Sequence, residues 1–121
     1  MINVNPNFEK NTIYVKIDGV PGSEEINQKI AEFIKICGQM KAGFNIINDV
    51  SDLKSDDLTQ FDLLSQLHKK IQTSFSVNKI IRVIGGSKLL LVKLLKVDEK
   101  FKINDIKYVA TMNDAEKLIA N

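Results

Sequence analysis

Short segments rich in β-branched residues alternate along this chain with longer segments whose apolar residues recur every three or four positions. The short segments are typical of buried or half-buried strands, and they occupy residues 12–18, 44–50, 79–84 and 106–112. The longer segments are typical of helices that bury one face, and they occupy residues 24–40, 55–75, 88–97 and 114–120. Alternating apolar and polar positions near residues 2–8 predict a further edge strand.

The order of these segments predicts an α/β fold. Strands that alternate with helices favour right-handed crossovers and a largely parallel sheet between layers of helices. The first two strands follow each other without a helix between them, so they add an antiparallel hairpin at one edge. We therefore expect one domain over residues 1–121, with the element order β-β-α-β-α-β-α-β-α and a mostly parallel mixed sheet.

Small polar residues stand where several helices begin. Ser23, Ser87 and Asn113 each precede a helical segment, and such side chains accept hydrogen bonds from the free N–H groups of a first turn. We expect all three to be N-caps. Residues 98–105 are rich in charge and predict a connection between the third helix and the last strand.

Composition places the chain among ordinary globular proteins. Of its 121 residues, 44% are hydrophobic and 26% are charged, which excludes a wholly disordered, collagen-like or coiled-coil chain. No apolar run approaches the roughly 20 residues of a membrane-spanning helix, and no basic and apolar secretory leader follows Met1. The single cysteine, Cys37, cannot form an internal disulfide, so we expect a reducing, cytoplasmic setting.

The formal net charge of +2 hides a division along the chain. Residues 1–68 hold 6 basic and 10 acidic side chains, residues 69–107 hold 10 and 3, and residues 108–121 hold 1 and 2. All basic residues but Arg82 are lysine. Nucleic-acid binding favours a concentrated and often arginine-bearing basic face, so we expect no nucleic-acid partner. The division favours oriented docking on a protein partner, or a homodimer.

A cluster of acidic residues follows the strand at residues 44–50 and consists of Asp49, Asp52, Asp56, Asp57 and Asp62. The carboxyl ends of strands are where α/β sheets place ligands, and converging carboxylates are able to hold a hard cation such as Mg²⁺. The alternative is that these residues cap the next helix and line a solvated loop, and acids at a helix start favour this interpretation. We therefore predict no metal site.

Three other features have structural interpretations that outweigh chemical ones. The turn at residues 85–88 (GGSK) is able to hold an anion, but it matches neither glycine-rich nucleotide motif, so a tight turn with a serine cap is favoured. His68 and Cys37 lie on apolar helical stripes, without a nucleophile–base pair or the spacing of zinc ligands. We expect no catalytic residue, no enzymatic activity and no cofactor.

The third helix carries apolar side chains on two sides. At about 100° per residue, one arc groups four leucines that we expect to be buried, namely Leu90, Leu91, Leu94 and Leu95. Leu89 and Val92 fall on the opposite side, among Lys88, Lys93 and Lys96. An exposed apolar pair ringed by lysines predicts docking of a partner or contact with a membrane surface, whereas lone exposed apolar residues are the ordinary alternative.

Four segments, in this order, resemble the STAS domain of the anti-sigma factor antagonists, and the likeness spans nearly the whole chain. TIYVKIDG, ending at Gly19 before a capped helix, resembles the second strand and first helix of that family. NIINDVSDL resembles its central strand and loop, and KIIRVIGG with its leucine-rich helix resembles the next unit. KYVATMNDAEKLIAN, with Ala115 and Leu118, resembles the last strand and helix. The resemblance implies a non-enzymatic module that binds a protein partner, such as an anti-sigma-like regulator.

In that family the loop after the central strand presents an Asp-Ser pair at a helix start, and a partner kinase phosphorylates the serine. Asp57 stands at the aspartate position but Leu58 stands at the serine position, so the resemblance implies no clear phosphoserine switch. Ser55 and Thr59 are the nearby hydroxyl groups and the candidate phosphosites. The predicted partner-binding residues are Asp49, Asp52, Ser55, Asp56, Asp57, Thr59, Lys88, Leu89 and Val92.

A divergent branch of the family lacks this switch and resembles the CRAL-TRIO lipid-transfer domains. In that branch helices two and three separate to expose an apolar cavity, and the leucine-rich third helix of this chain is similar to it. The branch implies an alternative function, which is a carrier or sensor of a small apolar or lipid-like ligand. The lining residues expected for such a pocket are Phe61, Leu64, Leu91 and Leu95.

Overall fold

The computed structural model describes residues 1–53, 58–103 and 105–120, excluding the side chains of residues 58–61. Its strands are β1 (Ile2–Asn7), β2 (Thr12–Ile17), β3 (Phe44–Asp49), β4 (Val77–Val83) and β5 (Ile106–Val109), and they form one sheet in that order. β1 is antiparallel to β2, and the remaining neighbours are parallel. The helices are α1 (Ser23–Cys37), α2 (Leu58–Ser74), α3 (Lys88–Lys100) and α4 (Met112–Ala120). The predicted element order and mixed sheet are confirmed.

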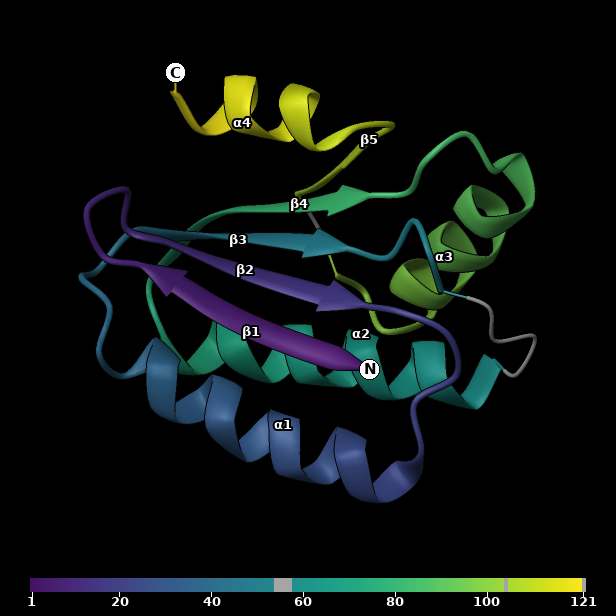
Figure 1. Ribbon diagram of the computed structural model, residues 1–121, viewed down its shortest axis with the longest axis horizontal. Coiled ribbons are helices and arrows are strands. Elements are labelled where there is room, and N and C mark those ends of the chain that lie inside the picture. The colour runs from purple at the N-terminus through teal and green to yellow at the C-terminus, as the bar shows by residue number, and fades with distance from the viewer. Residues whose placement is uncertain (54–57, 104, 121) are drawn as a thin grey trace.

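Helices cover both faces of the sheet (Figure 1). α1 and α2 lie on one face, α4 lies on the other, and α3 lies at the carboxyl ends of the parallel strands. The larger core is on the α1 and α2 side and includes the inward residues of α3, Leu90, Leu94 and Val97. A smaller core lies between the sheet and α4, around Ala115. The central strand β3 is buried along most of its length, as its nearly continuous apolar and amide sequence requires.

One of the three predicted N-caps is confirmed and two are wrong. Ser87 caps α3, since its side chain accepts a hydrogen bond of 3.1 Å from the backbone N–H of Leu90. Ser23 is instead the first residue of α1, and Gly22 precedes it without a side-chain cap. At α4 the cap is Thr111, whose Oγ1 accepts a bond of 3.1 Å from the N–H of Asp114, and Asn113 lies inside the helix. Propensity alone does not separate adjacent polar residues that are equally able to cap.

Two predicted boundaries also change near the third helix and the last strand. α3 continues to Lys100, so the residues expected to begin a charged connection form its last turn. The reason is Asp98, which is buried against the sheet rather than exposed in a loop. β5 ends at Val109 rather than at residue 112, because the chain turns there to let Thr111 cap α4.

Replacing Thr111 with Ala is expected to lower the free energy of unfolding by about 1 kcal/mol, because α4 loses its side-chain cap. The matched substitution Asn113→Ala, two residues further on, is expected to cost nothing, because alanine has the higher helix propensity and no cap is lost. Urea unfolding of the two variants measures the difference. A larger loss in Asn113→Ala than in Thr111→Ala would contradict this assignment of the cap.

Candidate functional site at the carboxyl end of the sheet

A row of polar side chains crosses the buried face of the sheet. Asn48 on β3 pairs in register with Arg82 on β4, and Arg82 pairs in register with Tyr108 on β5. They share a face with Ile46 and Ile80, since side chains two residues apart on a strand point the same way. The row therefore faces α2 and α3, where a charged side chain has no water to bind.

Asp98 of α3 neutralises the fully buried Arg82. The guanidinium donates from Nη2 and Nε to the two carboxylate oxygens, at 2.9 and 3.2 Å, and from Nη1 to Oδ1 of Asn48 at 2.8 Å. The hydroxyl of Ser65 on α2 donates to Asp98 at 2.7 Å, and the hydroxyl of Tyr108 also donates to Asp98. One carboxylate thus joins β4 and β5 to α2 and α3, and Arg82 extends the network to β3.

Burial and the bond to Asp98 raise the pKa of Tyr108, so its phenol keeps its proton and remains a donor. Sequence analysis identified Arg82 as the single arginine but missed this network. Two signals were present: an arginine inside an apolar strand requires a buried partner, and Asp98 continues the spacing of four from Leu90 and Leu94. The two together place an acid above the arginine.

The acidic loop after β3 is built from short-range contacts. Oδ1 of Asp49 accepts hydrogen bonds from the backbone N–H and the hydroxyl of Ser51, at 3.1 and 2.6 Å. Asp52 is paired with Lys16 at 3.5 Å. Gly85, in the turn before α3, has a φ of 67°, and a Cβ on it would lie 3.4 Å from Ser51, so this turn packs on the acidic loop. Asp49 and Asp52 thus hold neighbouring segments together, and the contacts described for them do not include a cap on α2.

The structure describes only part of the acidic cluster. Within residues 1–53, 58–103 and 105–120, no group of three or more acidic, histidine or cysteine side chains is placed to hold a metal ion. Ser55, Asp56 and Asp57 lie outside the described residues, and the side chains of Thr59 and Phe61 are not described. The two candidate phosphosites therefore stay predictions.

The outer side of α3, with the facing part of α2, forms a hollow that we call the α3 surface. Its volume is about 410 Å³, and its lining residues are Asp62, Leu89, Val92, Lys93, Lys96, Val97 and Lys100. Leu89 is 65% exposed and Val92 is 46% exposed, so their predicted outward orientation is confirmed. Lys100 spans the hollow to Asp62 at 3.1 Å. Lys88 lies at the first turn of the same helix.

The predicted buried arc of α3 is only partly correct. Leu90 and Leu94 are buried and Leu91 packs on the larger core, but Leu95 is 46% exposed. The face of α3 that carries Leu95 turns toward β5 at the open edge of the sheet, where it lines a hollow with Ile106. A narrower arc of α3 is buried than the helical wheel suggests, because in the described part of the chain β5 is the edge strand and no strand lies beyond it.

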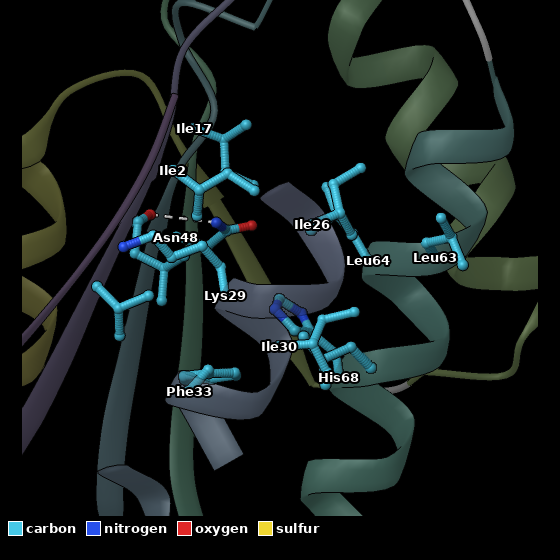
Figure 2. A pocket seen from close by; sticks show the side chains of 13 residues that line it. Ile2, Ile17, Ile26, Lys29, Ile30, Phe33, Asn48, Leu63, Leu64 and His68 are labelled. Atoms are coloured by element: carbon cyan, nitrogen blue, oxygen red, sulfur yellow. Dashed lines mark hydrogen bonds between the residues drawn. The ribbon is translucent and has the colours of Figure 1, made fainter. Parts of the chain in front are cut away.

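Two of the four residues expected to line one apolar pocket, Leu64 and Leu95, line separate hollows, and the side chain of Phe61 is not described. Leu64 lies in a cleft between α1 and α2, whereas Leu95 lies at the β5 edge on the far side of α3. The cleft is apolar, and Figure 2 shows His68 and Ile30 on its walls.

His68 is 2% exposed, and Cys37, beyond the cleft on α1, is 1% exposed. Burial raises the pKa of the Cys37 thiol to about 12, which leaves it unreactive.

Comparison with known proteins identifies the fold. No protein-family model and no curated protein matches this sequence. Among solved structures, the anti-sigma factor antagonist SpoIIAA in its unphosphorylated form matches with a TM-score of 0.65. The match covers 99% of this chain and 96% of that chain at 12% sequence identity. The STAS-like fold implied by the resemblance is therefore confirmed.

No helix in the described part of the chain is long and apolar enough to cross a membrane.

Replacing Asp98 with Asn is expected to lower the free energy of unfolding by about 3 kcal/mol or more, because it leaves the charge of Arg82 buried without a counter-ion. Glu99→Gln is the matched control, since it makes the same chemical change on the exposed neighbour and is expected to cost less than about 0.5 kcal/mol. Urea unfolding measures both. Equal effects would show that the buried pair is not a main source of stability.

Acidification is expected to destabilise the fold through His68. Burial and the charge of Arg82 hold the pKa of this imidazole well below its ordinary value, so below pH 6.5 the unfolded chain binds a proton that the folded chain does not. The free energy of unfolding then falls by up to about 1.4 kcal/mol per pH unit below about pH 6.5. Urea unfolding over this range measures the slope. His68→Leu is expected to lack this contribution, and an unchanged slope would contradict it.

Proposed function

We propose that this chain is a non-enzymatic regulatory module that binds a protein partner through its α3 surface. The observation that carries the proposal is the exposed pair Leu89 and Val92 beside a lysine-lined hollow at the carboxyl end of the sheet. The two residues are three positions apart, so their side chains lie next to each other on one helix face. Apolar side chains surrounded by charge are typical of docking surfaces.

The partner that fits this surface is an acidic segment with apolar anchors. Lys88, Lys93 and Lys96 lie along the same helix as the apolar pair, within a stretch of the chain rich in basic residues. Opposite charge on a partner would guide its approach and fix its orientation, while the apolar pair would provide the buried contact. The acidic residues Asp49 and Asp52 at the same end of the sheet would repel a partner docked in the reverse orientation.

The likeness to an anti-sigma factor antagonist supports this class of function, since an antagonist of an anti-sigma factor opposes a regulator. For this chain we propose an anti-sigma-like regulator as the class of partner. The contact would extend beyond α3 to the predicted partner-binding residues Ser55, Asp56, Asp57 and Thr59. Phosphorylation of Ser55 or Thr59 would add negative charge to this stretch of the chain, and would weaken binding to an acidic partner.

Other occupants of the α3 surface are outcomes of the test. An anionic membrane surface would also be attracted by the lysines, and a second copy of the chain would offer the acidic residues of its first 68 positions. The proposed carrier of a lipid-like ligand between helices two and three has no such supporting contact, because Leu64 and Leu95 line separate hollows. We therefore favour the protein partner.

The double substitution Leu89→Glu, Val92→Glu is expected to weaken partner binding at least about tenfold, because it buries charge where apolar contact is required. A photo-crosslinking residue at position 96 identifies the partner in host cells, and calorimetry with the purified pair then measures affinity. Phe8→Glu is the matched control, because Phe8 is 54% exposed in the turn between β1 and β2. This variant is expected to bind the partner normally.

Unchanged affinity in the double variant would contradict the proposal. The proposal would also be contradicted if crosslinking found no protein partner and the double variant instead lost binding to anionic vesicles or lost the ability to form a homodimer. Equal loss in Phe8→Glu would show that the effect comes from added charge rather than from the α3 surface.

A further inference from the structure

A second surface feature lies away from the α3 surface and contains an unsatisfied polar group. The cleft between α1 and α2 reaches down to the sheet, and its walls are the side chains of Ile26, Ile30, Phe33, Leu64 and Leu67 with Val4 and Val15 below them. It opens to solvent beside Leu63, which is 37% exposed, and beside Lys29. Figure 2 shows Ile26, Ile30, Phe33, Leu63 and Leu64 around the space, with His68 on the α2 wall.

His68 contributes the unpartnered group. Its side chain is 98% covered, and Nδ1 has no hydrogen-bond partner among the described residues. A buried polar atom without a partner destabilises the folded state, so a ligand that forms a hydrogen bond with Nδ1 would remove this cost. Asn48, the other polar residue deep in the cleft, has its amide engaged, because it donates to the carbonyl of Val15 at 3.2 Å and accepts from Arg82.

Water is a poor occupant of this space. A buried water needs about two to four polar partners, and here Nδ1 of His68 is the one that the described walls leave open. An anion is also poorly suited, because Asp98 already neutralises Arg82 and Lys29 is paired with Glu32 at 3.1 Å. The imidazole itself is neutral, since burial lowers its pKa. These conditions leave a neutral molecule that combines one hydrogen-bonding group with an apolar body.

We propose that the cleft binds a neutral amphiphile with a single hydroxyl group and an unbranched apolar tail, whose hydroxyl donates to Nδ1 of His68. The cavity volume is about 30 Å³, which admits the hydroxyl group. The tail lies in the open part of the cleft, across Ile30 and Leu63. This site is distinct from the α3 surface, and it does not depend on the proposed protein partner.

The single histidine of the chain makes the test direct. In the protein labelled with ¹⁵N-histidine, titration with 1-butanol, 1-hexanol and 1-octanol is expected to shift the Nδ1 resonance saturably. Affinity is expected to rise about threefold to fourfold with each added methylene, because each one buries further apolar area. 1-Chlorohexane, which has the tail without the hydroxyl, is expected to bind at least about tenfold more weakly than 1-hexanol.

Two variants separate the site from general hydrophobic binding. Leu63→Trp narrows the mouth of the cleft and leaves His68 as the reporter, so it is expected to abolish the shift. Leu95→Trp, at an exposed position near β5, is the matched control and is expected to bind as the parent does. In His68→Leu, where binding is measured from the methyl resonances of Ile30, the affinity for 1-hexanol is expected to fall to the level of the affinity for 1-chlorohexane. Absence of a saturable Nδ1 shift with every alcohol overturns the proposal, and so does equal binding of 1-hexanol and 1-chlorohexane.

Discussion

The ion pair between Arg82 and Asp98 is the interaction on which the rest of the structure depends. It lies where β4 meets α3, without access to water, and each charged oxygen accepts further bonds from Ser65 or Tyr108. A buried charge is tolerated only when it is paired and hydrogen-bonded, and here both conditions are met. The pair therefore fixes which face of α3 turns inward, and it fixes α2 through Ser65.

The candidate surfaces follow from that constraint. Because Leu90, Leu94 and Asp98 recur every four residues, the side of α3 that they share is held against the sheet. Leu89 and Val92 are then left outside, next to the lysines of the same helix. The shape of the α3 surface is thus set by a buried carboxylate on the opposite side of the helix, and not by any contact among the exposed residues.

The same constraint reaches the cleft between α1 and α2. Ser65 and His68 are three residues apart, so they share the inward side of α2, one bonded to Asp98 and the other open to the cleft. α2 is therefore an element of both candidate sites. The bond from Ser65 to Asp98 holds the middle of this helix in place.

Much of this fold follows from local pattern. The apolar alternation of the strands, the helical stripes and the outward Leu89 and Val92 are properties of single segments, so the sequence is sufficient to predict them. The cap at Thr111, the exposure of Leu95 and the helical position of Asp98 depend on what a neighbouring segment places nearby. The network was missed because its members come from five elements that are distant in sequence. Its register could be derived only after the strand pairs Asn48–Arg82 and Arg82–Tyr108 were known.

A double-mutant cycle on Arg82 and Asp98 tests the central claim most directly. Arg82→Met and Asp98→Leu are made alone and together, and urea unfolding gives the three changes in the free energy of unfolding. Each single variant leaves one buried charge without its partner, whereas the double variant replaces the pair by apolar groups of similar size. The account predicts that the double variant loses less free energy of unfolding than the two single variants lose together, by about 2 kcal/mol or more. Losses that simply add would contradict it, because they would show that the two residues stabilise the fold independently.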